Sequence, residues 1–270
     1  MKLTKKQKEK FISDGYIIID IFSKSELKHF KNSVSQIINF MITQLPDNKS
    51  KIKKGEELSK GISLLRNSRN ELISDFSDFL TNLPESMRLI GNKKIKTIVN
   101  NLLGVNSNDP IYITNATPIV ALPNDRDYTY KFHKDTFYTI PESKYVQIWA
   151  PLIENATGKN GALQICEKSH KNEKNCEYVK KNVPNRHRYR VNKKELKKYK
   201  VRDCKLKIGQ VLFFDSGIAH QSGRNSSKNA RISLVGVYHK VKNKKIRPMS
   251  PQFKFKGKTP EEYFEEINGK

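Results

Sequence analysis

The chain of 270 residues has few cysteines, few acidic residues and no long hydrophobic run. Its cysteines, Cys166, Cys176 and Cys204, are odd in number and lack the paired spacing of a disulfide framework or a zinc site. Free thiols are typical of a reducing compartment. The first apolar run, residues 16–19, ends at Asp20 and is too short for a signal peptide or a membrane span. We therefore expect a cytoplasmic protein with no membrane partner.

Acidic residues are scarce relative to basic ones, since 52 Lys and Arg face 27 Asp and Glu and the formal net charge is +25. A nucleic acid or an anionic metabolite as partner would explain this charge. The chain is also rich in Lys, Asn and Ile, as an AT-rich coding sequence produces without selection. Its lysines far outnumber its arginines, whereas proteins that read grooves or clamp phosphates favour arginine. The charge alone leaves a functional and a compositional origin open.

The order of the hydrophobic patterns predicts a single domain over residues 1–270, in which a mostly helical layer (1–105) precedes a β core (106–240). Helices are predicted at 4–14, 23–44, 69–81 and 84–103, with one short strand at 16–21. After Pro110, short β-rich runs separated by turn residues are typical of an antiparallel sandwich or barrel. The strands are predicted at 111–121, 128–133, 144–153, 161–165, 204–208, 211–215 and 230–239.

A basic insertion at residues 171–200 interrupts the predicted β core. It holds 12 Lys or Arg against three Glu, and it shows no clear strand periodicity. A long excursion inside a compact domain is usually functional or disordered. Our hypothesis is that the insertion forms a lid whose cations recruit an anionic small molecule. The remaining tail, residues 241–270, is first basic and then acidic.

The segment His133-Lys134-Asp135 is the strongest candidate for chemistry. Alternation along a strand would place His133 and Asp135 on one side and Lys134 on the other. Two histidines and one carboxylate leave three positions of a metal open, the arrangement of non-haem Fe(II) oxygenases. His220, which follows the apolar run 211–214, is the best candidate for the second histidine. A solvated His and Asp beside a turn give the same pattern, so both interpretations stay open here.

Arg231 lies 11 residues after His220, at the head of the apolar run 232–235. A guanidinium at the start of a buried strand costs free energy unless it has an anionic partner. Its planar fork can bind both oxygens of a carboxylate, so an organic acid co-substrate would be a natural partner. A surface arginine at a strand edge is the alternative.

Several ordered motifs resemble those of the phytanoyl-CoA dioxygenase family. Residues 130–138 (YKFHKDTFY) resemble its metal-binding strand, and residues 147–152 (QIWAPL) resemble its next strand. The resemblance continues through other segments of the chain, namely FISDGY at 11–16, NGALQI at 160–165, SHK at 169–171, GQVLFF at 209–214, HQS at 220–222 and Asn225. It covers residues 4 to about 240, which is most of the chain.

The resemblance implies an α+β, mainly β fold. Its core would be a double-stranded β-helix, a jelly-roll and cupin-like arrangement, with an N-terminal helical layer. The family's chemistry implies Fe(II) bound by His133, Asp135 and His220, with 2-oxoglutarate as co-substrate and O₂ as oxidant. The protein would then be an enzyme of the dioxygenase class.

The resemblance also implies how the co-substrate is held and what the products are. Arg231, helped by Ser222, would bind the distal carboxylate of 2-oxoglutarate, and Gln147 and Trp149 would line the same pocket. The reaction would hydroxylate an aliphatic C–H bond and release succinate and CO₂. Related halogenases replace the carboxylate ligand with a small residue, so Asp135 favours hydroxylation.

The chain departs from the family pattern at two places. Glu167-Lys168 stands where the family usually has Pro-Gly, which puts the geometry of that turn in doubt but not the chemistry. Lys134 stands between the ligands, where a neutral side chain is common. His170, in the turn that follows, is expected to brace a loop rather than bind metal.

We expect the substrate to be a small polar or anionic metabolite, such as a sugar or a phosphorylated or nucleotide-linked compound. The candidate substrate contacts are Lys134, Tyr130, Tyr138 and His187. The tyrosines fit a core position equally well.

Two alternative functions remain. One is a nucleic-acid-directed oxygenase, but the demethylases of that type carry a second arginine six residues after the first, and here that position is Val237. No specific nucleic-acid partner is therefore expected. The other is a non-catalytic β-sandwich that binds a metabolite, and the complete set of ligands together with Arg231 argues against it.

Overall fold

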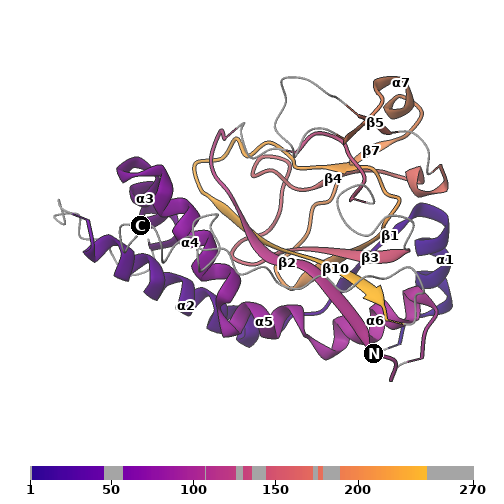
Figure 1. Cartoon of the computed structure of the whole chain (residues 1–270), viewed down its shortest axis with the longest axis horizontal. Coiled ribbons are helices and arrows are strands. Elements are labelled where there is room, and N and C mark those ends of the chain that lie inside the picture. Colours follow the sequence, from indigo (N-terminus) through magenta and orange to yellow (C-terminus); the bar gives the residue numbers. More distant parts are fainter. Residues whose placement is uncertain are drawn as a thin grey trace, which may run out of the picture.

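Figure 1 shows the computed structural model of the chain, with most of its helices along one side of a β core. The structure describes residues 2–45, 57–106, 108–125, 130–135, 144–172, 176–178 and 189–241. Within these residues, none of the helices combines the length and the apolar character that crossing a membrane requires.

The first helix, α1 (Lys5–Asp14), begins and ends as its sequence predicts. The Thr4 hydroxyl accepts a hydrogen bond from the Gln7 backbone N–H, and the Gln7 side chain accepts one from the Thr4 N–H, which completes a capping box. Gly15 follows at φ +86°, a left-handed conformation that glycine adopts without strain. The chain then turns directly into strand β1 (Tyr16–Asp20).

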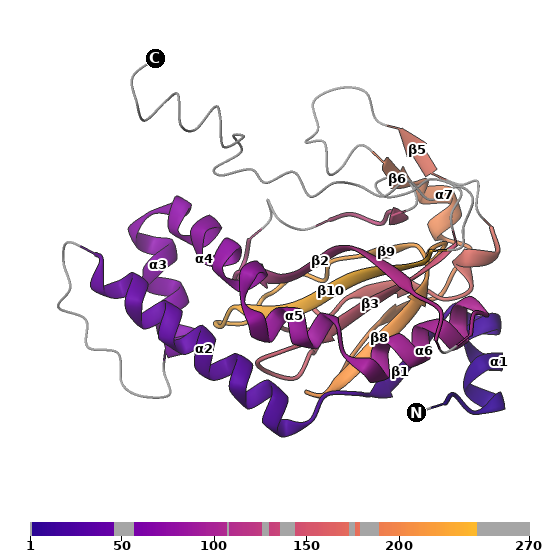
Figure 2. The same cartoon turned by 60° about the horizontal axis from the view of Figure 1, so that its bottom comes forward.

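A layer of helices follows, led by α2 (Lys24–Thr43). Ser23 and Glu26 form a second capping box at its start, and its buried side chains recur at helical spacing: Leu27, Phe30, Val34, Ile38, Met41 and Ile42. The layer continues through a π-helical turn (Glu57–Gly61), α3 (Ile62–Ser68), α4 (Asn70–Asn82), α5 (Pro84–Ile90) and α6 (Lys93–Leu103). In Figure 2, α5 and α6 run across the face of the main sheet, and α2 packs against α5 beside it.

The main sheet has five antiparallel strands in the order β1-β8-β3-β10-β2. Its other members are β8 (Gln210–Asp215), β3 (Tyr145–Pro151), β10 (Arg231–Lys240) and β2 (Ile111–Ala121). Strand β1 lies at one edge, so the N-terminal segment belongs to the sheet although it precedes the helices in the chain.

Side chains on β10 alternate between two layers. Ile232 and Leu234 pack into the apolar cluster formed with the helices, whereas Arg231, Ser233 and Val235 line a cavity on the opposite face. The same alternation on β8 sends Phe213 to the helices and Phe214 to the cavity. One sheet therefore closes the main core with one face and builds a cavity with the other.

A second, smaller sheet of order β7-β4-β9 faces this cavity, with β7 (Val201–Asp203), β4 (Gln164–Cys166) and β9 (His220–Gln221). The basic insertion contributes a hairpin of β5 (Cys176–Tyr178) and β6 (Tyr189–Val191), then the short helix α7 (Lys193–Leu196). The antiparallel two-sheet arrangement predicted from the sequence is confirmed.

Three predicted elements differ from the structure. Residues 130–133 of the strand predicted at 128–133 form only an isolated bridge, in which His133 pairs with His220. The helix predicted at 84–103 breaks at Gly91, because the Asn92 side chain caps a new helix by accepting from the Lys94 N–H. The strand predicted at 204–208 is reduced to one bridge at Leu206.

His239 on β10 is buried at the end of the sheet, where its ring lies 4.7 Å from the Tyr145 ring and 3.3 Å from the Thr114 hydroxyl. Burial lowers the pKa of His239 to about 4. The folded protein therefore holds this imidazole neutral, whereas the unfolded chain protonates it near pH 6.5.

Stability from His239 is expected to be present above pH 6.5 and to be lost as the pH falls toward 4. Between pH 7 and pH 5 the free energy of unfolding should drop by about 1–2 kcal/mol through this group. Urea unfolding at both pH values would measure the drop, and His239→Gln should reduce it. An unchanged pH dependence in His239→Gln would contradict the assignment.

Candidate metal centre and its cavity

Three potential metal ligands converge at the edge of the smaller sheet. His133 and His220 exchange two backbone hydrogen bonds of 3.0 Å across their isolated bridge, so their side chains lie side by side with ring centroids 4.4 Å apart. Asp135 follows His133 by two residues. One ligand atom from each of the three residues lies within 4.8 Å of the others. Within the described parts of the chain, this is the cluster of His, Cys, Asp and Glu close enough to hold a metal ion.

Both imidazoles are turned so that the same nitrogen faces Asp135. The Nδ1 atom of His133 lies 2.7 Å from the Lys131 carbonyl, and that of His220 lies 3.0 Å from the Ile218 carbonyl. A carbonyl accepts only from N–H, so each Nδ1 carries a proton and Nε2 is the nitrogen that each ring can offer to a metal. These Nε2 atoms lie 3.1 and 3.7 Å from the Asp135 carboxylate oxygens. Two imidazoles that present Nε2 and one carboxylate suit Fe(II).

Burial and mutual interaction shape the pKa values of the three groups. Burial and the neighbouring His133 lower the pKa of His220 to about 4. Burial opposes charge on His133 as well, but the hydrogen bond and charge of Asp135 outweigh it and raise the pKa of His133. For Asp135, burial favours the neutral acid, yet the two histidines lower its pKa. At neutral pH the Asp135 carboxylate is therefore ionised and His220 is neutral, as metal coordination requires.

A cavity of about 470 Å³ opens in front of the three residues, between the two sheets. Most of its wall is apolar, and the described residues that line it come from both sheets and from the segment before His133: Thr117, Ile119, Tyr130, His133, Asp135, Gln147, Ile148, Trp149, Leu163, Phe214, His220, Ser222, Arg231, Ser233, Val235, Gly236 and Val237. An organic co-substrate and part of a second molecule can be enclosed here, with their polar groups met at a few points.

Arg231 provides a cation in this wall, 3% exposed. Its Nε donates to the Asn160 carbonyl at 3.0 Å, its Nη1 donates to the Ser233 hydroxyl at 2.7 Å, and its Cζ lies 5.1 Å from the centre of the Trp149 ring. Burial lowers the pKa of Arg231 to about 10, so it stays charged at neutral pH. The charge of Glu154 acts on Arg231, but within the described residues the two side chains form no ion pair, and a buried guanidinium in this state favours an anionic ligand.

Gln147 provides a second unsatisfied polar group. Its side chain is 3% exposed and lines the cavity, and its Nε2 has no hydrogen-bond partner among the described residues. Its place on β3 is opposite Val237 of β10, six residues beyond Arg231. At about 3.4 Å per residue, the two backbone positions are about 20 Å apart. The cavity therefore has an anion-binding end at Arg231 and an amide donor toward its other end.

The structure brings most of the predicted site residues together. Tyr130, Trp149 and Ser222 line the cavity with the three candidate ligands. The hydroxyl that accepts a hydrogen bond from Arg231 is that of Ser233, and the help of Ser222 in binding the co-substrate stays a prediction. Tyr138 and His187 lie outside the described residues.

Lys134 is not at the cavity. It is buried at 2% exposure, and its ammonium donates to the backbone carbonyls of Ser169 and Asn172. Alternation at His133-Lys134-Asp135 therefore holds, with the lysine directed away from the two candidate ligands. A direct contact of Lys134 with substrate has no support in this geometry.

Ser233 and the apolar wall of β2 and β10 were not recognised as site residues in the sequence. Ser233 follows Arg231 by two residues on the same strand, so alternation places both on one face. That periodicity was the available signal for Ser233 and for Val235. For Thr117 and Ile119 on β2 no comparable signal exists, because their place in the wall depends on the pairing of β2 with β10.

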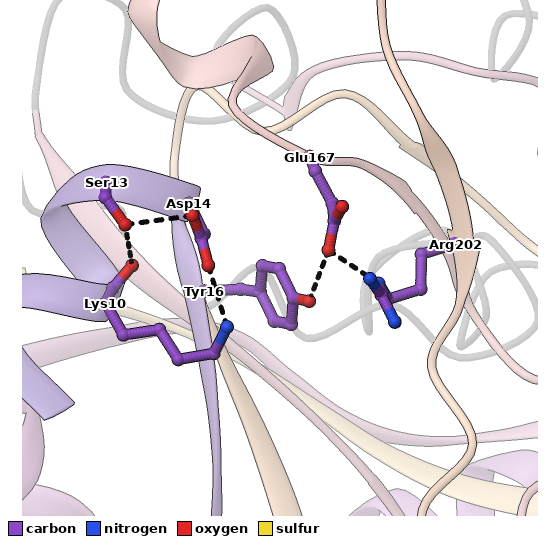
Figure 3. Close-up of polar contacts among 6 residues, drawn as sticks. All are labelled: Lys10, Ser13, Asp14, Tyr16, Glu167 and Arg202. Carbon is purple, nitrogen blue, oxygen red and sulfur yellow. Dashed lines mark hydrogen bonds and ion pairs between the residues drawn. The ribbon is translucent and has the colours of Figure 1, made fainter.

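The turn that departs from the family pattern keeps a tight geometry by other means (Figure 3). Lys168 adopts φ +66°, the left-handed conformation, at the position where the family usually has glycine. Beside it, Glu167 accepts hydrogen bonds from the Tyr16 hydroxyl at 2.6 Å and from Arg202 Nε at 2.5 Å. These contacts tie β1 and β7 to the turn.

His170, in the same turn, braces the N-terminal helix. Its Nε2 lies 3.1 Å from the Ile12 carbonyl. Its ring lies so close to Gly15 that a Cβ there would approach Nδ1 within 2.5 Å.

Comparison with known proteins decides the family. The sequence matches the family model for phytanoyl-CoA dioxygenase (PhyH) over residues 11–233. The chain belongs to the phytanoyl-CoA dioxygenase family. This is a family of dioxygenases, so the prediction of an enzyme of this class is confirmed. No curated protein sequence matches the chain significantly.

Solved structures share the fold of this family member. EvdO2 from Micromonospora carbonacea var. aurantiaca, crystallised with 2-oxoglutarate, is 16% identical with a TM-score of 0.60, and the match covers 93% of this chain and 96% of that one. EctD from S. alaskensis with bound Fe is 19% identical with a TM-score of 0.60, covering 96% and 85%. The epimerase SnoN, crystallised with Fe³⁺, alpha-ketoglutarate and nogalamycin RO, is 11% identical with a TM-score of 0.58, covering 92% and 95%. The predicted double-stranded β-helix with a helical layer is confirmed.

Proposed function

We propose that this protein is an Fe(II)- and 2-oxoglutarate-dependent dioxygenase that hydroxylates an aliphatic C–H bond of a small molecule. The observation that carries the proposal is the juxtaposition of two kinds of group in one cavity. Two imidazole lone pairs and a carboxylate converge on one side, and a buried cation without a described ion-pair partner lies in the same wall. The crystal structures of EvdO2 with 2-oxoglutarate and of EctD with Fe, which share this fold, support the same assignment.

Each residue has a distinct task in this proposal. His133, Asp135 and His220 hold the metal, and the carbonyls that receive their Nδ1–H groups keep the imidazole rings in position. Arg231 binds the distal carboxylate of 2-oxoglutarate with the N–H groups that Asn160 and Ser233 leave free.

Two further residues control the surroundings of the reacting groups. Trp149 covers one face of the Arg231 guanidinium, which excludes water and strengthens the ion pair with a bound carboxylate. Gln147 donates its unpaired amide N–H to an oxygen of a bound molecule at the other end of the cavity. The bound Fe(II) would supply the O₂-dependent oxidation, with succinate and CO₂ formed from 2-oxoglutarate. Because Asp135 occupies the carboxylate position, hydroxylation is favoured over halogenation.

The purified protein, supplied with Fe(II), 2-oxoglutarate and air, is expected to produce succinate slowly without added substrate and faster with it. Mass spectrometry of succinate measures the rate. The background rate of succinate formation is measured in two controls, one without Fe(II) and one with the Asp135→Ala protein. A succinate rate equal to these backgrounds, with and without a mixture of metabolites, would leave the cavity as a binding site without catalysis.

We further propose that the substrate is a polar or anionic metabolite whose reacting carbon lies in an uncharged part. Apart from Asp135 and Arg231, the described cavity wall is neutral. Exposed cations lie on α7, at Lys193 and Lys194. This part of the insertion is joined to the metal segment, because the N–H of Val191 donates to the carbonyl of Phe132 at 2.8 Å. A sugar or lipid carrying a phosphate or nucleotide group fits this combination of a neutral cavity and exposed cations on the insertion.

Separation of a metabolite extract on an anion-exchange resin tests the substrate class. The retained, anionic fraction is expected to raise succinate formation severalfold, and 0.5 M NaCl should weaken the effect because exposed charges are screened. Stimulation by the unretained fraction alone, insensitive to salt, would reject the anionic class and retain the reaction.

A further inference from the structure

Lys134 lies between two candidate ligands yet faces away from the metal. Its ammonium donates to the Ser169 carbonyl at 3.2 Å and to the Asn172 carbonyl, at the start and just past the end of a short 3₁₀ helix (Ser169–Lys171). At 2% exposure, an ammonium that lost these acceptors would carry a large desolvation cost. The segment His133-Lys134-Asp135 is thereby fastened to a turn 35 residues further along the chain.

Ser169 is fastened in turn to the segment that carries the other histidine. Its side chain is fully buried, its hydroxyl accepts from the Ala219 N–H at 2.8 Å, and the hydroxyl donates to the Cys166 carbonyl at 2.8 Å. The Cys166 N–H donates back to the Ala219 carbonyl at 2.8 Å. Ala219 directly precedes His220. One buried serine therefore contacts both ligand-bearing segments, through its carbonyl on one side and its hydroxyl on the other.

The bridge between His133 and His220 does not by itself fix the three ligands. Two further backbone hydrogen bonds hold this segment, from the Ser222 N–H to the Tyr130 carbonyl at 3.2 Å and from the Val191 N–H to the Phe132 carbonyl at 2.8 Å, and both lie before His133. Asp135 lies two residues beyond the bridge, where a movement of the chain would displace its carboxylate. The hydrogen bonds of Lys134 restrict this movement next to Asp135.

We propose that Lys134 and Ser169 form a positioning pair that sets the separation of Asp135 from His133 and His220 and so determines the affinity for the metal. The pair touches neither metal nor substrate, and it acts through the backbone of the ligand segments. The inference rests on the proposed function, since it concerns the Fe(II) site.

Anaerobic Fe(II) titration of variants tests the pair. Lys134→Met removes the donor with little change in volume and is expected to weaken Fe(II) binding by about 10–100-fold, as loss of a group that orients ligands typically does. Lys134→Arg can still donate to both carbonyls and should recover most of the affinity. Lys28→Met, which removes an exposed lysine on α2, is the control and should bind as the wild type does.

Ser169→Ala provides an independent variant, needed if Lys134→Met does not fold. It should weaken Fe(II) binding comparably, and the double variant should be no weaker than the weaker single one, because both changes break the same connection. The visible absorbance of the Fe(II)–2-oxoglutarate complex should shift or broaden in these variants, as it reports ligand geometry.

Melting temperature separates positioning from packing. If Lys134→Met and Ser169→Ala melt lower but bind Fe(II) within twofold of the wild type, with an unchanged absorbance band, the pair only packs the turn and the proposal is overturned. A wild-type protein that binds no Fe(II) would instead remove the proposed function, and the positioning pair with it.

Discussion

Replacing His220 with alanine is expected to abolish Fe(II) binding and succinate formation while the protein stays folded. The imidazole supplies one of the three ligand atoms, so its loss should exceed the about 10–100-fold cost of removing a group that only orients a ligand. The fold should survive, because the bridge between His220 and His133 uses backbone atoms alone. Anaerobic titration with Fe(II) and circular dichroism measure the two properties.

His29→Ala is the matched control for this experiment. His29 is exposed on α2, far along the chain from the cavity, so its loss removes an imidazole without touching the site. Fe(II) affinity unchanged in His220→Ala would place the metal elsewhere. Equal loss in both variants would indicate nonspecific binding of Fe(II) to histidines.

Replacing Arg231 with methionine is expected to raise the dissociation constant for 2-oxoglutarate by about 100-fold or more, because breaking a buried charge pair costs about 2–5 kcal/mol. Fe(II) binding without 2-oxoglutarate should not change, since Arg231 contacts none of the three ligands. The dissociation constant of Arg231→Lys should lie between those of the wild type and Arg231→Met, because an ammonium binds a carboxylate without the bidentate geometry of a guanidinium.

Thermal or urea unfolding in the presence of 2-oxoglutarate and a redox-inert metal measures this prediction without turnover. A concentration 100 times the wild-type dissociation constant stabilises the wild type by about 2.7 kcal/mol, and the same concentration should stabilise Arg231→Met by only about 0.4 kcal/mol. Arg88→Met removes an arginine whose side chain is 73% exposed on α5, and it should behave as the wild type. Full stabilisation of Arg231→Met would show that the carboxylate binds elsewhere.

Local signals predicted the parts of this fold that local interactions determine. The capping residues Thr4 and Ser23, and Gly15 after α1, marked helix ends within one residue of their positions in the structure. Alternation placed His133 and Asp135 on one side and Lys134 on the other. The apolar run before His220 correctly indicated a core strand, β8, that leads into the cavity.

Contacts between distant segments could not be predicted in the same way. The partners of Lys134 are carbonyls 35 and 38 residues away, and backbone carbonyls leave no trace in a sequence. The prediction of Lys134 as a substrate contact therefore could not take these acceptors into account. The short strand β9 was missed for the same reason, since two residues carry no periodicity and the pairing of β9 with β4 alone defines it.

The turn at Glu167-Lys168 shows the limit of a motif. The family's Pro-Gly predicts its left-handed conformation directly, whereas this chain reaches it with a lysine at φ +66°. Hydrogen bonds from Tyr16 and Arg202 to Glu167 restrict the conformation of the turn, as the proline ring would. Tyr16 and Arg202 lie 151 and 35 residues from Glu167 in the sequence, so only the structure shows how this turn is stabilised without Pro-Gly.

The two-layer alternation of β10 has a consequence for how this enzyme can diverge over evolutionary time. Ile232 and Leu234 pack in the core with the helices, while Val235 and Val237 line the cavity. Mutations at the first pair are therefore selected for stability, and mutations at the second pair for the molecule that the cavity binds. Exchanges at Val235 or Val237 can admit a new molecule without disturbing the residues that hold the domain together. Substrate specificity can therefore change through residues of this strand while the fold is conserved.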